Sequence, residues 1–301
     1  MERLRVGDLV ALVAPSGAIG AEELAAAVRV VESWGLKTRV GRHARGRHSF
    51  HSGTDAERLA DLNDALRDPA VRGILCLRGG YGLQRIVDDV DFVAARADPK
   101  PMMGYSDITA LHVALWCEAG LPTVHGPTAG HLFRGADEAR RALMSGEPIE
   151  VAADPAESTF PVRVGGRAEG VLLGGNLTIL AATAGTRHRP DLRGAILLIE
   201  DVNEAPYRID RSLVQLRRAG WLDGLAGVAI GQFIRCADET YPRTAEEVLA
   251  EQLGEKIPVL GGLPIGHGER QTAVGLGVRA VLDADAGTLV VQAAYVRRSA
   301  T

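Results

Sequence analysis

The sequence lacks the features that define several large classes of protein. Its three cysteines, Cys76, Cys117 and Cys236, are widely spaced and odd in number, which fits neither a disulfide framework nor a zinc-binding spacing. We interpret them as buried thiols in a reducing compartment. The net charge is only −4 and no long run of one sign occurs, so neither nucleic acid nor an anionic membrane is expected as a partner.

The chain also lacks a long apolar run. The N-terminus meets only a short apolar segment before Pro15, which is too brief for the core of a signal peptide. The longest uncharged stretch, between Glu169 and Arg187, is interrupted by glycines, threonines and Asn176, so it reads as a buried strand, turn and helix and not as a membrane span. These observations predict a cytoplasmic protein.

Aromatic residues are scarce, at 4% of the chain, whereas glycine contributes 36 residues. The core must therefore consist mainly of Ala, Val, Leu and Ile, with many tight turns. This composition favours an α/β architecture, in which helices cover both faces of aliphatic parallel strands. A length of 301 residues allows two domains, each with its own core.

Strands and helices alternate along the first half of the chain. The hydrophobic pattern and a capping box that begins at Thr54 predict strands over 9–14, 71–77 and 101–105, and helices over 21–34, from 55 onward and over 108–117. Such alternation predicts a doubly wound parallel sheet, with a ligand site beyond the carboxyl ends of its strands. The first domain is expected to span 1–135.

The pattern loses its period between 135 and 167, where Gly, Pro and charged residues alternate. We therefore expect an inter-domain connection over 136–165 and a second domain over 166–301. In that domain the sequence predicts strands over 171–173, 195–199 and 227–230, a helix over 207–219, and a β-hairpin of 278–282 with 289–292.

The segment Gly104-Tyr105-Ser106-Asp107 is the first candidate for chemistry. A strand ends here, a serine follows glycine by two positions and a helix begins at once, as in a nucleophile elbow. The dipole of that helix favours negative charge developing beside Ser106, and the backbone N–H of Asp107 is expected to point toward the same space. The alternative is that Ser106 or Asp107 only caps the helix, which is a common role.

The glycine cluster Arg78-Gly79-Gly80-Tyr81-Gly82 also follows a predicted strand. Its glycines allow the backbone to approach a ligand and to present N–H groups, which suits an oxyanion hole. A phosphate cradle is the rival use, but neither the P-loop pattern nor the dinucleotide fingerprint is present. A simple tight turn is the third reading.

Glu200 and His267 complete the set of candidates. Glu200 ends an aliphatic strand, where a carboxylate can orient a histidine; alternatively it is a solvated charge, and Asp201 with Asn203 caps the next helix. His267 lies between two glycines and can titrate near neutral pH. The chain order of Ser106, Glu200 and His267 is that of α/β-hydrolases. That fold is disfavoured because no glycine follows Ser106 by two positions.

Taken together, these residues resemble the LD-carboxypeptidases, the serine peptidase family that includes muramoyltetrapeptide carboxypeptidase and the microcin C immunity peptidases. The likeness runs almost end to end. It is carried by Val13-Ala14-Pro15-Ser16-Gly17, Arg78-Gly79-Gly80-Tyr81-Gly82, Gly104-Tyr105-Ser106-Asp107, Gly174-Gly175-Asn176-Leu177, Ile199-Glu200-Asp201, Tyr207-Arg208-Ile209-Asp210-Arg211 and Gly266-His267-Gly268.

The resemblance implies a flavodoxin-like N-terminal domain and a smaller, β-rich α/β C-terminal domain. It implies Ser106 as nucleophile, His267 as base and Glu200 as the acid of the triad, with the N–H groups of Gly80 and Asp107 as the oxyanion hole. It also implies a cytoplasmic homodimer without metal or cofactor, which removes the terminal D-alanine of murein tetrapeptide during cell-wall recycling.

Two other functions stay open at this point. An immunity-type peptidase that cleaves peptidyl-nucleotide or aminoacyl-nucleotide antibiotics needs an aromatic platform for the base, and between 135 and 200 the only aromatic residue is Phe160. A non-catalytic small-ligand-binding module would explain the glycine turns but not the joint presence of the three triad candidates. Arg78 and Tyr81 are the candidates for contact with the substrate.

Overall fold

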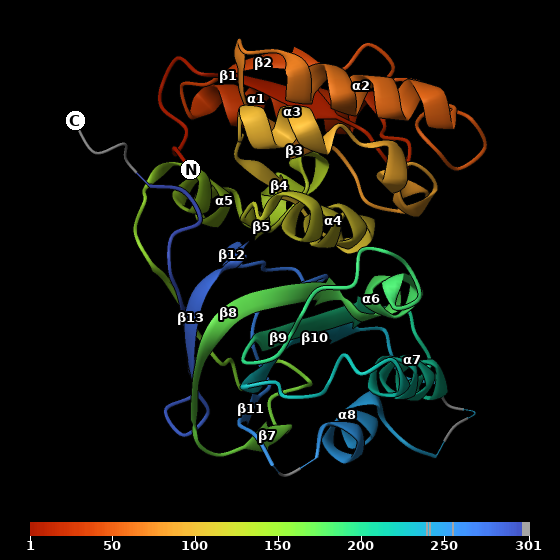
Figure 1. Ribbon diagram of the computed structural model, residues 1–301, viewed down its shortest axis with the longest axis vertical. Helices are drawn as coiled ribbons and strands as arrows, with labels where there is room; N and C mark the ends of the chain where they lie inside the picture. Colours follow the sequence, from red (N-terminus) through yellow and green to blue (C-terminus); the bar gives the residue numbers. More distant parts are fainter. Residues whose placement is uncertain (239, 241, 255, 297–301) are drawn as a thin grey trace.

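Two β-sheets organise the chain in the computed structural model, which describes residues 1–238, 240, 242–254 and 256–296. The sheet built mainly from the first half of the sequence lies above the sheet built from the second half in Figure 1. The C-terminal five residues of the expected second domain lie outside the described residues. No helix among the described residues is both long and apolar enough to cross a membrane.

The first sheet has the strand order β12-β5-β4-β3-β1-β2. Its parallel strands are β1 (Leu9–Val13), β2 (Lys37–Val40), β3 (Val71–Cys76), β4 (Met102–Gly104) and β5 (Thr123–His125), and β12 (Val274–Leu276) adds to β5 antiparallel. The order 2-1-3-4-5 is the flavodoxin-like one, in which a site forms where the strand order reverses. The predicted doubly wound sheet is therefore confirmed.

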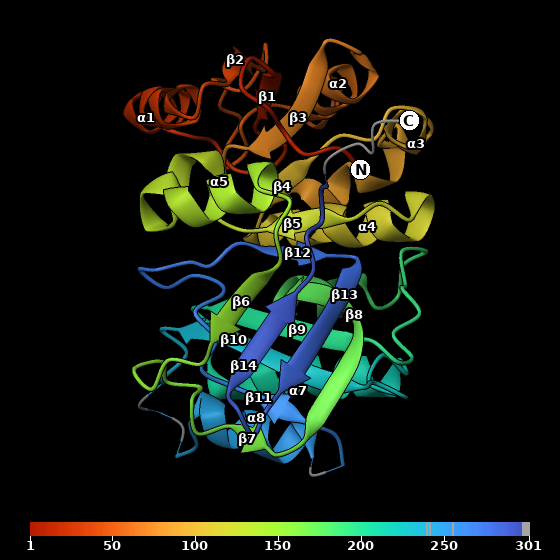
Figure 2. The same cartoon turned by 90° about the vertical axis from the view of Figure 1, so that its left-hand side faces the viewer.

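Helices cover both faces of this sheet because its strands are apolar on both sides. Val10 and Leu12 pack with α1 (Ala21–Ser33) and α5 (Ala136–Met144). Ala11 and Val13 point the other way, toward α2 (Asp55–Arg67), α3 (Phe92–Ala97) and α4 (Thr109–Ala119). Figure 2 shows α1 and α2 on opposite sides of β1. The capping box predicted at Thr54 is present at the start of α2.

The second sheet has the order β6-β14-β13-β8-β9-β10-β11-β7. Parallel pairing joins β8 (Arg167–Asn176), β9 (Ile196–Val202), β10 (Gly227–Ile234) and β11 (Val259–Leu260). The predicted hairpin is confirmed as β13 (Val278–Asp283) and β14 (Thr288–Val291), and β6 (Ile149–Ala152) and β7 (Arg163–Val164) pair antiparallel at the two edges. It is accompanied by the helices α6 (Leu177–Thr183), α7 (Pro206–Arg218) and α8 (Ala245–Leu253).

The segment 136–165 differs from the irregular connection that the sequence predicts. It contains α5, which packs in the core of the first half, and the strands β6 and β7, which join the second sheet. The buried side of α5 consists of Ala139, Ala142 and Leu143, which is a weak apolar signal. The two strands are too short for alternation to be recognised in the sequence.

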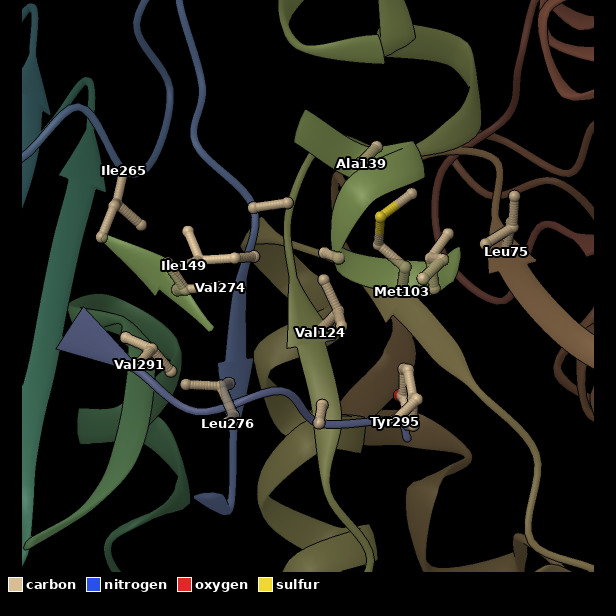
Figure 3. Close-up of a cluster of buried hydrophobic side chains, with 14 of the residues drawn as sticks. Leu75, Met103, Val124, Ala139, Ile149, Ile265, Val274, Leu276, Val291 and Tyr295 are labelled. Carbon is tan, nitrogen blue, oxygen red and sulfur yellow. The ribbon is translucent and has the colours of Figure 1, made fainter. Parts of the chain in front are cut away.

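One continuous apolar core connects the two sheets. Figure 3 shows Leu75, Met103 and Val124 of the first sheet packed toward Ile149 and Val291 of the second, with the β12 residues between them. In addition, the hydroxyl of buried Tyr295 accepts a hydrogen bond from the N–H of Met102 (2.9 Å) and donates to its carbonyl (3.1 Å). The shared core holds the strand ends of both sheets in a defined relation.

Candidate active site

Ser106 lies at the carboxyl end of β4, on the 3₁₀ helix η3 (Ser106–Ile108) that leads directly into α4. Its φ of 65° places a non-glycine residue in the left-handed region. Such strain is tolerated where the surrounding structure enforces it, and it is the backbone shape of a sharp strand-to-helix turn. The serine therefore stands where β4 ends, close to the reversal of strand order.

The glycine loop after β3 lies against this serine. A Cβ atom on Gly79 would lie 2.8 Å from Cβ and 3.1 Å from Oγ of Ser106, so only glycine fits there. Gly80, with a φ of +104°, follows at once. Neither the N–H of Gly80 nor that of Asp107 donates a hydrogen bond to another described residue. Both N–H groups belong to residues that directly follow the contact between Gly79 and Ser106.

Asp107 joins the loops around the serine instead of capping a helix. Its carboxylate Oδ2 accepts hydrogen bonds from Oγ of Ser16 (2.6 Å) and from the N–H of Leu83 (2.9 Å), and neither η3 nor α4 has a side-chain cap. The capping alternative is therefore wrong for Asp107. Burial raises the pKa of this carboxyl, although both hydrogen bonds act in the opposite direction.

Glu200 and His267 form a close pair in the second half of the chain. Oε2 of Glu200, in β9, lies 2.6 Å from Nδ1 of His267, which sits in the loop after β11. The Glu200 side chain is fully buried, so the reading of Glu200 as a solvated charge is wrong. Burial alone would raise the pKa of Glu200, but the charge and hydrogen bond of His267 outweigh it, and the pKa is lowered.

Asp201 forms hydrogen bonds with the start of a helix that precedes it in the sequence, and not with the following helix that the sequence suggests. Its carboxylate accepts hydrogen bonds from Nδ2 of Asn176 (2.9 Å) and from the N–H (3.0 Å) and hydroxyl (2.8 Å) of Thr178, so it binds the start of α6 and not of α7. Burial and the charge of Glu200 raise the pKa of Asp201 to about 6. Asp201 therefore supports the strand end that carries Glu200.

Contacts between the two halves place His267 beside the serine element. The ring centroid of Tyr105, the residue before Ser106, is 4.6 Å from that of His267. Nη1 of Arg134, in the 3₁₀ helix η4 (Ala129–Arg134), donates to the carbonyls of His267 (2.8 Å) and Gly268 (3.3 Å). No hydrogen bond joins Ser106 to His267 in the part of the chain that the structure describes. Sequence reasoning missed Arg134, which stands in no recognisable motif.

Arg78 and Tyr81 lie next to these groups. Nη1 of Arg78 donates to the carbonyl of Ala18 (2.6 Å), and the Tyr81 ring is half exposed beside Phe50, at a centroid distance of 5.6 Å. Both residues line a hollow that also includes Gly80. Within the described ranges, no cluster of three or more His, Cys, Asp or Glu side chains could hold a metal ion.

The chain belongs to the LD-carboxypeptidase family. The family model of the N-terminal domain matches residues 10–126, and the model of the C-terminal domain matches residues 169–282. Together these segments contain all of the site residues described above except Arg134, and they leave out the strands β6, β7 and β14 of the second sheet. The protein is accordingly a serine-type LD-carboxypeptidase, as the motifs predicted.

Similar proteins cover almost the whole chain. A putative carboxypeptidase of Streptomyces coelicolor, SCO6489, is 45% identical over 96% of this chain and 94% of its own length. The murein tetrapeptide carboxypeptidase of Pseudomonas aeruginosa is 36% identical, with 91% and 92% covered.

Solved structures show the same fold. The muramoyltetrapeptide carboxypeptidase of Oxalobacter formigenes matches with a TM-score of 0.82 at 29% identity, over 96% of this chain and 100% of that one. The microcin C7 self-immunity protein MccF matches with a TM-score of 0.87 at 24% identity, over 98% of each chain. At that identity, the likeness to MccF concerns the fold alone.

Proposed function

We propose that this carboxypeptidase removes the terminal D-alanine of murein tetrapeptide with a Ser106–His267–Glu200 triad. The observation that carries the proposal is the buried Glu200–His267 pair, which is held by Arg134 beside the element that bears the strained Ser106. The relatives that act on murein peptides support the choice of substrate. By resemblance to the family, we also propose that the enzyme works in the cytoplasm as a homodimer.

The reaction begins when Oγ of Ser106 attacks the carbonyl that joins an L-centre to D-alanine, while Nε2 of His267 takes the hydroxyl proton. Glu200 holds the tautomer of His267 and stabilises the imidazolium. The N–H groups of Gly80 and Asp107 receive the negative charge on the carbonyl oxygen. The C–N bond then breaks and His267 gives its proton to the amine of D-alanine.

Water completes the cycle. His267 removes a proton from a water molecule, which attacks the acyl-enzyme, and Ser106 leaves with that proton restored to its oxygen. The contact between Ser106 and His267 must shorten when substrate binds, because the unliganded site has no hydrogen bond between them. Catalytic hydrogen bonds often reach their working length only in the enzyme–substrate complex.

The test is the release of D-alanine from purified murein tetrapeptide, measured by mass spectrometry. Ser106→Ala should lower kcat by a factor on the order of 10⁴ to 10⁶, because no other group can form the acyl-enzyme. An unchanged thermal unfolding midpoint would show that the variant is folded. Wild-type turnover by Ser106→Ala would refute the proposed mechanism. Size-exclusion chromatography with light scattering tests the dimer.

The immunity-type alternative has a specific observation against it. The guanidinium carbon of Arg163 lies 4.9 Å from the ring centroid of Phe160, and the glycine at 262 packs against the same ring. This aromatic residue is thus already engaged within the fold, and a nucleobase would have to displace Arg163 to stack on it. Comparing turnover of murein tetrapeptide with turnover of an aminoacyl-sulfamoyl adenosine separates the two substrates.

A non-catalytic ligand-binding module is the remaining alternative. Such a module needs no reactive serine, whereas an enzyme with the proposed triad does. A fluorophosphonate probe therefore discriminates between them: labelling located at Ser106 by peptide mass spectrometry supports the enzyme. Loss of the label in Ser106→Ala provides the control.

A further inference from the structure

A hollow of about 540 Å³ opens beside the glycine loop that touches Ser106. It is lined by Gly17, Ala18, Arg47, Ser49, Phe50, Arg78, Gly80 and Tyr81. Its floor is backbone: the N–H of Gly17 donates to the carbonyl of Gly79 (2.9 Å), and Gly79 lies in contact with Ser106 on its other side. The hollow therefore adjoins the glycine loop that packs against Ser106.

The charge of the hollow is positive and uncompensated. Among the described residues, neither Arg47 nor Arg78 forms an ion pair with a carboxylate, and both side chains belong to exposed residues. The neighbouring cations differ, since Arg58 and Arg85 both pair with Asp55. Arg78 uses one N–H on the carbonyl of Ala18, which orients its guanidinium and leaves further donors for an anion.

The other side of the hollow is aromatic. Phe50 and Tyr81 are 62% and 53% exposed, and their ring centroids are 5.6 Å apart. This adjacent pair of exposed rings lines the same hollow as Arg47 and Arg78, and an exposed apolar patch beside polar groups is typical of a ligand-binding surface. Cations on one side and apolar rings on the other suit a short residue that carries a carboxylate.

We propose that this hollow binds the terminal carboxylate of the substrate, with Arg78 and Arg47 as its cationic partners and with Phe50 and Tyr81 beside the departing residue. The proposal rests on the proposed function, in which Ser106 attacks the last peptide bond. Successive Cα atoms are about 3.8 Å apart, so the terminal carboxylate must lie one residue beyond the oxyanion hole. Arg78 and Gly80, whose N–H is assigned to the oxyanion hole in the proposed mechanism, line the same hollow.

This arrangement explains why the enzyme would cut only at a chain end. A guanidinium pairs strongly with the carboxylate of a free C-terminus. A longer peptide presents a neutral amide at the same position, so the guanidinium has no charge to pair with. A hydrogen bond to a charged group typically changes affinity by a factor of about 10 to 100. Selectivity for a free C-terminus therefore depends on the two arginines.

The test separates binding from turnover by using the full-length Ser106→Ala protein. Calorimetry compares murein tetrapeptide ending in free D-alanine with the same peptide ending in D-alanine amide. We expect the acid to bind 10 to 100 times more tightly than the amide. In Ser106→Ala with Arg78→Ala, the acid should bind as weakly as the amide, and Arg78→Lys should restore part of the difference.

Arg47→Ala, at an exposed position, gives a second variant with little risk to folding, and it should lose part of the same preference. Arg45→Ala is the matched control, because it removes the same charge from the same exposed loop outside the hollow and should change nothing. Equal binding of acid and amide to the Ser106→Ala protein overturns the proposal. So does an Arg78→Ala effect that is equal for both peptides. The proposed function fails by a different observation, namely wild-type turnover by Ser106→Ala.

Discussion

His267 and Glu200 lie 67 positions apart in the sequence, yet Nδ1 of one is 2.6 Å from Oε2 of the other. Glu200 lies near the end of β9 and His267 lies in the loop after β11, and Gly266 packs directly on the carboxylate: a Cβ atom there would lie 2.7 Å from Oε2. The proposed base and its proposed orienting acid are therefore assembled within one half of the molecule. The serine comes from the other half, so docking of the two sheets completes the site.

Replacing Glu200 by Gln should lower kcat by a factor of about 10³ to 10⁴, because the amide can donate to Nδ1 and so favours the wrong tautomer of His267. The measurement is steady-state D-alanine release. Glu169→Gln is the control: that carboxylate pairs with Arg279 on the surface, far from the chemistry, and its loss should leave kcat unchanged. Full activity of Glu200→Gln would contradict the assigned role.

Replacing Arg134 by Ala should lower kcat by a factor of about 10 to 100 and leave KM nearly unchanged. The guanidinium positions the carbonyls of His267 and Gly268 across the two halves, and a small displacement of the base is costly. Arg134→Lys should recover part of the loss. Arg140→Ala, an exposed arginine of α5, serves as the matched control. An increase in KM with kcat unchanged would indicate that Arg134 contacts the substrate instead of positioning His267.

Replacing His112 by Gln should reduce the amount by which the free energy of unfolding falls when the pH is lowered. Burial lowers the pKa of His112 from 6.5 to about 3, so the unfolded chain binds a proton that the folded one refuses. Its contribution to stability is therefore complete above pH 6.5 and is lost as the pH falls toward 3. Between pH 6.5 and 4 this amounts to about 3 kcal/mol, at 1.4 kcal/mol per pKa unit.

Glutamine keeps a donor for the carbonyl of Gly104, which lies 2.9 Å from Nε2 of His112. The difference in unfolding free energy between wild type and His112→Gln, measured by urea titration at pH 7 and pH 4, gives the outcome. If this difference in unfolding free energy were the same at pH 7 and pH 4, His112 would be protonated in the folded protein at pH 4, which would contradict the prediction.

Sequence reasoning found the parts of the fold that carry dense local signals. Aliphatic runs located the central strands, and the turn residues located the end of β4 beside Ser106, whereas β9 continues past the predicted end at 199 and contains Glu200. It did not find α5, whose buried side is mostly alanine, nor the short strands β6 and β7. The sequence also did not predict the pairing of β12 with β5, because this contact joins residues from opposite halves of the chain.

The sequence by itself determined which side chains could perform the chemistry, because strand periodicity and turn residues are local properties. Only the tertiary structure decided that Asp107 joins two loops, that Arg134 holds the loop of His267, and that Arg47 faces the same hollow as Arg78. These contacts depend on how the two sheets pack through one shared core. That packing brings together residues that are far apart in the sequence, so no short segment predicts it.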